Sequence, residues 1–187
     1  MALTDQMIRA SQLDVNLYEE VEKDTTQTSN ALTVVAIAAI ATGIGAAIAE
    51  ALSGGGSGGG GIVLGLIGGV IAALVGWALW TAIVYYIGTS LFGGTATWGE
   101  VLRTVGFANS PGVLRILGFI PVLGALITLL VGIWTIVTTV VAVRQALDIT
   151  TGKAIIVSIL GAIVAFVVIG IIGAVLAIPA IAVGALR

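Results

Sequence analysis

The sequence contains no cysteine and no histidine among its 187 residues. Their absence excludes thiol catalysis, disulfide bonds, histidine metal ligands and histidine acid–base catalysis. Charge is also scarce, because only 9% of the residues are Asp, Glu, Lys or Arg. Soluble domains carry about a quarter charged residues, so this composition excludes a water-soluble globular core of this size. The scarcity of basic residues also argues against a nucleic-acid partner.

Long apolar runs are what the sequence has in abundance. Hydrophobic residues make up 59% of the chain, and the mean hydropathy is +1.22. A helix needs about 20 apolar residues to cross a bilayer, and four runs approach or exceed that length: 31–52, 62–92, 122–143 and 154–178. They do not alternate with period two, which indicates helices rather than a β-barrel. The sequence therefore predicts an all-α, polytopic helical membrane protein.

A shorter apolar segment, Pro111–Ile120, lies between the second and third long runs and contains Arg115. An arginine inside the membrane costs at least about 2.5 to 3.5 kcal/mol, which makes Arg115 a candidate functional charge. If this segment crosses, Arg103, Arg144 and Lys153 share the side of the amino-terminal segment, as the positive-inside rule favours. With four crossings, Arg144 and Lys153 move to the opposite side. We expect five helical segments forming four or five transmembrane spans, the third short.

Residues 1–30 form a polar segment with six acidic and two basic residues. This segment lacks the pattern of a signal peptide, so we expect the mature protein to keep it. Apolar residues recur at helical intervals over Thr4–Leu13 and Asp14–Asp24, which predicts two short amphipathic surface helices, the second capped by Asp14. We expect these helices to pack on the bundle of the same chain, with the membrane surface or a neighbouring protein as the alternatives.

Small residues recur at four-residue spacing in the first two long runs. Gly45 and Ala49 form such a pair in the first run, and Gly65 and Gly69 form a GxxxG pair in the second. Small residues let helices approach closely in lipid, where association depends on packing more than on hydrophobicity. These four residues are therefore candidate helix-packing or partner contacts.

The run GGGSGGGG at 54–61 separates the first two apolar runs and has the composition of a flexible coil. A phosphate-binding P-loop would need a lysine and then Ser or Thr at the start of the next helix, where Ile62 and Val63 stand instead. We predict a linker at 54–61 inside a transmembrane domain covering 31–187.

The spacing of Thr97 and Glu100 is that of a capping box, which predicts a helix over 96–107. Its apolar residues share one face, which contains Trp98, whereas Arg103 falls off that face. We expect this helix to lie along the membrane interface, with Trp98 as a candidate partner contact.

Aromatic residues gather in the second half of the second long run. We expect them at the lipid headgroup layer, with an aromatic pigment or lipid pocket as the alternative. These residues are Trp77, Trp80, Tyr85, Tyr86 and Phe92.

The order of TWGEVLRTVGFANSP, an apolar turn with Pro121, VAVRQALDITTGKA and a final apolar run resembles the Yip1 domain family. The segment NLYEEVEKD before an Ala-rich first span is similar to bacterial members. The resemblance implies five transmembrane helices, a cytoplasmic amino terminus and a bacterial plasma (inner) membrane. Eukaryotic relatives bind prenylated small GTPases. Only Asn16, Leu17 and Tyr18 echo their acidic aromatic motif, so a GTPase partner has little support here.

We therefore expect a non-enzymatic integral membrane protein that organises the lipid bilayer or binds other membrane proteins, including as an accessory subunit of a larger complex. No cofactor or metal is expected. The alternative is a small channel or transporter, which needs polar or ionisable groups facing a cavity. The ionisable candidates are Arg115 and Glu50, and the candidate hydroxyls are those of Thr128, Thr135, Thr138 and Thr139.

Overall fold

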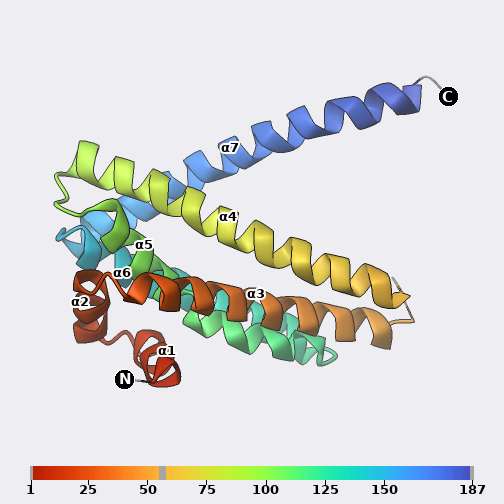
Figure 1. The fold of residues 1–187 in the computed structure, drawn as a ribbon, viewed down its shortest axis with the longest axis horizontal. Coiled ribbons are helices and arrows are strands. Elements are labelled where there is room, and N and C mark those ends of the chain that lie inside the picture. Colours follow the sequence, from red (N-terminus) through yellow and green to blue (C-terminus); the bar gives the residue numbers. More distant parts are fainter. Residues whose placement is uncertain (1, 55–57, 186–187) are drawn as a thin grey trace.

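The computed structural model describes residues 2–54 and 58–185 of the chain. These residues contain no strand and form seven α-helices and one 3₁₀ helix, η1 (Figure 1). Four helices are long and apolar enough to cross a membrane, namely α3, α4, α6 and, up to Ile171, α7. The predicted all-α membrane architecture is confirmed. The elements are α1 (Leu3–Ser11), α2 (Val15–Lys23), α3 (Gln27–Leu52), α4 (Gly58–Phe92), α5 (Trp98–Ala108), η1 (Ser110–Phe119), α6 (Leu123–Ala146) and α7 (Thr151–Ala185).

The long elements run back and forth along the length of the molecule (Figure 1). α3 leads away from the tail helices α1 and α2, and α4 returns. η1 leads away again beside α3, and α6 returns to α2. At the end of α6, the Gln145 amide donates from Nε2 to Glu19 Oε1 over 2.8 Å. Arg144 and Lys153 therefore lie at the same end as the tail, as the arrangement of five segments requires.

The third segment is short because proline interrupts it. Pro111 stands in the first turn of η1, and Pro121 lies in the turn between η1 and α6, where it has no backbone donor to continue a helix. The 10 residues of η1 rise about 2.0 Å each and so cover about 20 Å. The hydrocarbon core of a bilayer is about 30 Å thick, so η1 by itself is shorter than a span.

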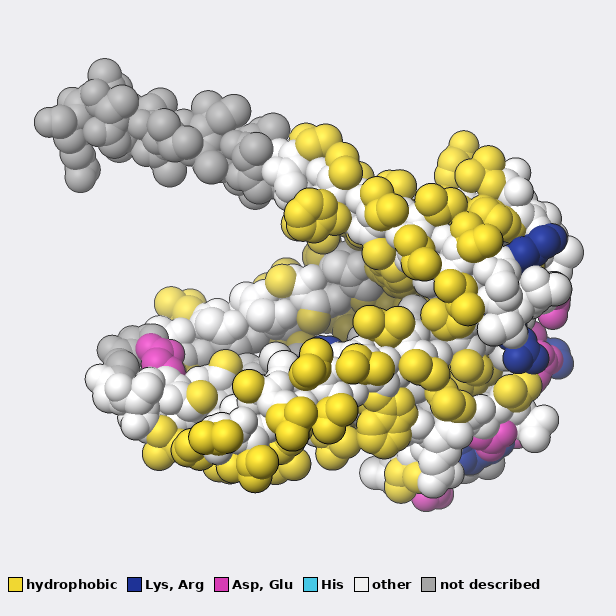
Figure 2. Space-filling model, turned by 180° about the vertical axis from the view of Figure 1, so that it is seen from behind, with side chains coloured by type: hydrophobic (Ala, Val, Ile, Leu, Met, Phe, Trp, Pro, Cys, Tyr) yellow, Lys and Arg dark blue, Asp and Glu magenta, His cyan; other side chains and the backbone are white. Residues whose placement is uncertain are grey.

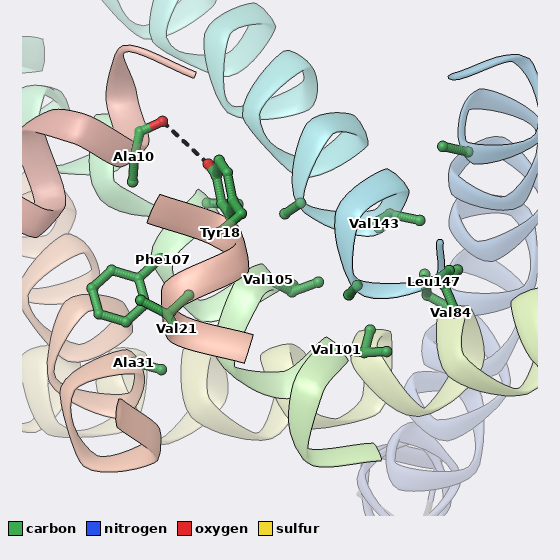
Figure 3. Packing of buried hydrophobic residues seen from close by; sticks show 14 of the residues in the cluster. Ala10, Tyr18, Val21, Ala31, Val84, Val101, Val105, Phe107, Val143 and Leu147 are labelled. Carbon is green, nitrogen blue, oxygen red and sulfur yellow. Dashed lines mark hydrogen bonds between the residues drawn. The ribbon is translucent and has the colours of Figure 1, made fainter. Parts of the chain in front are cut away.

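The hydrophobic core lies at the end of the bundle where the tail docks (Figure 3). Leu17, Tyr18 and Val21 of α2 are fully buried, and so is Phe107 of α5. α5 is the central element, because it contacts α2, α3, α4 and α6. The tail helices thus pack on their own bundle, which is the arrangement expected from their amphipathic pattern.

The helix predicted over 96–107 spans Trp98–Ala108 and begins with the expected capping box. The Thr97 backbone N–H donates to the Glu100 carboxylate over 2.7 Å, and the Glu100 N–H donates to Thr97 Oγ1 over 3.4 Å. The prediction that Arg103 falls off the buried face is wrong, since its side chain is only 5% exposed. The reason is that neighbouring helices cover α5 on several sides.

The glycine-rich linker is shorter than predicted. α4 begins at Gly58, so the last four residues of the stretch 54–61 form its first turn. Gly58 has a φ of +64°, a left-handed backbone conformation that glycine adopts without steric cost. Residues 55–57 of the predicted linker lie outside the described residues.

Candidate functional site

The Arg103 side chain reaches from α5 to the carboxyl-terminal end of α2. Its Nε donates to the Val21 carbonyl over 2.9 Å, and its Nη2 donates to the Glu22 carbonyl. The last carbonyls of a helix have no partner within that helix, and the negative end of the helix dipole favours a cation. Arg103 therefore caps α2 and ties the tail to the centre of the bundle.

Acidic side chains surround this cap. Burial raises the pKa of Glu22 to about 7, and repulsion from Glu19, Asp148 and Glu100 adds to the effect, against a small opposing contribution from Lys23. The Glu22 Oε2 atom has no hydrogen-bond partner among the described residues. Within residues 2–54 and 58–185, no group of three acidic side chains is arranged to hold a metal ion.

A second set of charges joins α1 to α2. Arg9 donates from Nε to Asp14 Oδ2 over 2.7 Å and from Nη1 to Glu20 Oε2 over 2.9 Å. The hydrogen bonds from Arg9 are the largest cause of the lowered pKa of both carboxyls. Asp14 also accepts from the Asn16 backbone N–H, which confirms it as the cap of α2. These contacts hold the turn between the two tail helices.

Tyr18 lies at the centre of the docked tail. Its hydroxyl donates to the Ala10 carbonyl over 3.1 Å (Figure 3), and burial raises the pKa of the phenol. Leu17 is also fully buried. Two of the three residues that echo the acidic aromatic motif are thus core residues in this chain and present no surface to a GTPase.

The small-residue pair of α3 faces η1. A Cβ added at Gly45 would lie 2.7 Å from the Arg115 carbonyl oxygen and 2.9 Å from that of Ile116. Ala49 is half-buried one turn further along α3. Backbones this close tolerate only glycine, so Gly45 serves packing inside the chain.

The small-residue pair of α4 faces no part of the described chain. Gly65 and Gly69 are exposed, and a Cβ added at either would have no described atom within 4 Å. With about 100° per residue, Gly69 points about 20° and Gly65 about 60° from the direction of Trp80. Trp80 and Val84 contact α7, since a Cβ at Gly161 would lie 3.3 Å and 3.1 Å from them. Gly65 and Gly69 therefore form an exposed glycine face of α4 that contacts no described atom.

The first half of α4, which contains both glycines, lies apart from α7 (Figure 1). From their contact near Gly161, α4 and α7 diverge toward the end of the molecule opposite the tail (Figure 1). In an apolar stretch of 18 residues of α4, only 6% of the stretch is buried inside the described chain, against 33% in the corresponding stretch of α3. The first half of α4 is therefore largely exposed in the described part of the chain.

The other predicted site residues are not brought together. Arg115 is half-buried in η1, and no ion pair in the described part of the chain includes it. Glu50 is exposed in the last turn of α3. Trp98 is 39% exposed and packs edge to face against Tyr85, with ring centroids 6.3 Å apart. Trp98 is thus partly committed to a contact within the chain.

Three of the four threonine hydroxyls of α6 donate to backbone carbonyls, whereas Thr128 is exposed. Thr135 donates to the Val131 carbonyl over 2.8 Å, and Thr139 donates to the Thr135 carbonyl over 2.7 Å. Thr138 donates to the Ala108 carbonyl of α5 over 2.7 Å. The Thr138 bond joins α6 to α5, whereas the other two lie within α6; both uses are usual for threonine in membrane helices.

The aromatic residues of α4 divide between the core and the surface. Trp77 is 9% exposed, and its Nε1 donates to the Leu102 carbonyl of α5 over 3.2 Å. The prediction that Trp77 belongs to an aromatic belt is therefore wrong, because the indole N–H has a partner inside the bundle. Tyr86, by contrast, is 68% exposed.

Sequence reasoning missed a groove of about 410 Å³ between α1, η1 and α6. The α1 wall lies more than 90 positions before the walls from η1 and α6, so no local pattern predicts the groove. The one sequence signal is the four-residue recurrence of Thr4, Ile8 and Gln12 on α1. Trp134 of α6 forms part of the wall, and its Nε1 donates to the Ser11 carbonyl over 2.8 Å.

The family model of the Yip1 domain matches residues 16–184, from α2 to the last turns of α7. Neither the curated proteins nor the solved structures gave a match. The matched region contains all four helices that are long enough to cross a membrane, together with α5 and η1. Since the family model covers well over half of the chain, this integral membrane protein belongs to the Yip1 domain family.

Proposed function

We propose that this protein is a non-enzymatic membrane protein that binds another membrane protein, receiving one transmembrane helix of that partner on the α4 glycine face (Gly65 and Gly69). The observation that carries the proposal is that this exposed face touches no described atom. Glycine destabilises a helix interior by about 0.5 to 1 kcal/mol relative to alanine. Lipid chains do not require glycine, whereas close helix packing does.

Other glycines of the spans allow close contacts between helices inside the chain. Gly43 of α3 accommodates the Leu66 side chain, since a Cβ there would lie 2.6 Å from Leu66 Cδ2. Gly45 accommodates the backbone of η1 in the same way. The α4 glycine face is equally suited to a close helix contact, and the part of the chain described above supplies none.

The charge distribution supports a cytoplasmic amino terminus in a bacterial plasma membrane. Charged side chains gather at the tail end of the molecule, whereas hydrophobic side chains cover its long flanks (Figure 2). Lys23, Arg103, Arg144 and Lys153 all belong to elements at the tail end. Basic residues are retained on the cytoplasmic side of membranes. In this orientation the protein acts as an accessory subunit whose partner helix lies within the bilayer.

A small channel or transporter has less support. Such a protein needs polar or ionisable groups along a cavity in the membrane. Thr135, Thr138 and Thr139 bond to backbone carbonyls instead. Glu50 is exposed at the end of α3, which leaves Arg115 as the one candidate charge within the spans.

Purification of the tagged full chain from its native membrane in mild detergent tests the proposal. We expect a co-purifying membrane protein in fixed ratio, and its loss in the double variant Gly65→Leu and Gly69→Leu. Gly132→Leu is the matched control, because a Cβ at Gly132 of α6 also has no described atom within 4 Å. Equal recovery of the partner with both variants would refute the proposed face. Ion flux in liposomes that Arg115→Ala abolishes would favour the channel instead.

A further inference from the structure

The groove beneath α1 is built from three elements. α1 contributes the helix face that contains Thr4, Ile8 and Gln12, η1 contributes Leu114 among others, and α6 contributes Trp134. Its volume of about 410 Å³ lies within the range of about 300 to 1,000 Å³ that is typical of ligand pockets. The groove is open along one side, so an elongated ligand can enter it laterally.

Polar contacts with three neighbouring helices hold α1 over the groove. The Trp134 indole N–H donates to the Ser11 carbonyl over 2.8 Å, and the Tyr18 hydroxyl donates to the Ala10 carbonyl over 3.1 Å. The Gln6 amide donates to Gln27 Oε1 of α3 over 3.1 Å. These bonds link α1 to α6, α2 and α3. The groove is therefore formed before any ligand binds.

The lining determines the chemistry of the occupant. Among the residues that the structure describes, no charged one lines the groove, and Arg9 of α1 is engaged with Asp14 and Glu20 outside it. The large apolar side chains in the groove remain open, since Ile8 is 56% exposed and Leu114 is 40% exposed. Covering such surface is worth about 25 cal/mol per Å². An uncharged hydrocarbon chain fits this lining, whereas a phosphate or a peptide with charges does not.

The groove is continuous with the surface that faces lipid. Leu130 and Val137 lie one turn before and one turn after Trp134 on the same face of α6, and they are 55% and 42% exposed. α6 is one of the four helices long enough to span the membrane, whereas α1 belongs to the polar tail. The groove thus leads from the lipid-facing side of α6 to a position beneath a polar helix, where hydrocarbon and headgroup layers meet.

We propose that this groove binds one acyl chain of a bilayer phospholipid, with α1 as its roof. The Thr4 hydroxyl, which lines the groove and is exposed, is the donor for the ester carbonyl of that chain. This site is separate from the α4 glycine face and does not depend on the partner helix proposed there. A bound lipid adds to the contacts that hold α1 on the bundle.

Tryptophan fluorescence tests the proposal directly, because Trp134 lines the groove. Phosphatidylcholine with brominated acyl chains, added to the full chain in detergent micelles, quenches indoles that it touches. We expect quenching that saturates at a single lipid per chain and disappears in Trp134→Phe. Thr4→Phe, which fills the groove, should remove the saturable part. Asp5→Phe is the matched control, because Asp5 is also exposed on α1 but does not line the groove.

Two results would overturn the proposal. One is quenching that increases with lipid without saturation and is the same in Thr4→Phe and Asp5→Phe, which indicates contact with bulk lipid alone. The other comes from replacing Ile8 with the photoreactive residue benzoylphenylalanine and irradiating the chain in phosphatidylcholine vesicles. The proposal requires a product with the mass of one chain plus one phospholipid. A crosslinked product of two chains would show that a second copy of the protein occupies the groove. Absence of the product with phospholipid would show that the groove does not bind this lipid.

Discussion

Arg103 of α5 donates its Nε hydrogen to the carbonyl of Val21 in α2, over a distance of 2.9 Å and a separation of 82 positions in the chain. The donor side chain is buried, and the acceptor lies in the last turn of its helix. Because α5 also contacts α3, α4 and α6, this one bond connects the polar tail to most of the membrane-embedded bundle.

Replacement of Arg103 with methionine should destabilise the docked tail. The variant keeps the apolar length of the side chain but leaves the Val21 and Glu22 carbonyls without their donor. Hydrogen bonds from a charged group are worth about 1.5 to 3 kcal/mol, and we expect a loss of that size in the free energy of unfolding. Thermal unfolding in detergent, followed by circular dichroism, measures it.

Arg144→Met is the control for this variant, because Arg144 is only half-buried and donates no side-chain hydrogen bond in the described residues. We expect its effect to be small. If both variants lost the same stability, removal of a positive charge rather than loss of the α2 cap would be the cause.

As the pH rises from about 4.5 to about 7, the ionisation of Glu22 should lower the free energy of unfolding. Its pKa is about 7 in the folded chain, above the ordinary 4.5, so in this window the folded chain binds more protons than the unfolded chain. Above pH 7 the carboxyl is ionised in both states and contributes no further change. Glu22→Gln should flatten the profile in this window and raise the melting temperature at pH 8.

Other acids of the tail act in a different range. The lowered pKa values of Asp14 and Glu20 mean that their contribution is lost only as the pH falls below their ordinary values of 3.8 and 4.5. The chain has no histidine to titrate near neutrality. Asp5→Asn serves as the control, and a Glu22→Gln profile indistinguishable from it would count against the role of Glu22. Thermal unfolding at half-unit pH intervals provides the comparison.

Two glycine-to-alanine changes should have opposite effects. At Gly45 the new Cβ would lie 2.7 Å from the Arg115 carbonyl oxygen, and overpacking of this kind costs about 1 to 3 kcal/mol. At Gly65 no described atom lies within 4 Å, so Gly65→Ala should stabilise α4 by about 0.5 to 1 kcal/mol. Unfolding of the two variants side by side in detergent tests this, and a loss of stability at Gly65 would reveal a neighbour that the single chain lacks.

Cysteine accessibility should show on which side of the membrane each end of the bundle lies. The chain contains no cysteine, so Thr4→Cys, Ser53→Cys and Thr151→Cys each introduce a single reactive thiol at an exposed position. We expect Thr4→Cys and Thr151→Cys to react from the same side of the membrane and Ser53→Cys from the opposite side. If Thr4→Cys and Thr151→Cys were labelled from opposite sides, the membrane would not be crossed between α4 and α6, where α5 and η1 lie.

Local sequence patterns predicted the elements well. The long apolar runs correspond to α3, α4, α6 and α7, the Thr97 and Glu100 spacing marks the start of α5, and Pro121 marks the break before α6. Each of these signals depends on residues within a few positions of one another or on the cost of leaving lipid. None of these signals depends on which helices pack against one another.

The same patterns could not distinguish residues whose roles depend on distant partners. Gly45 and Gly65 carry identical small-residue signals, yet one meets η1 and the other meets no described atom. The sequence around Arg103 gives no sign that its side chain is buried, because its acceptor, the Val21 carbonyl, lies in a segment far away in the chain.

The sequence by itself therefore determined that the chain is a helical membrane protein, because the transfer of apolar runs into lipid depends on composition and length alone. Only the tertiary structure decided that the tail packs on the bundle, that the α4 glycine face meets no described atom and that α1 covers a groove. Each of these features is a relation between surfaces of different helices, and a relation of that kind exists only once the helices have packed.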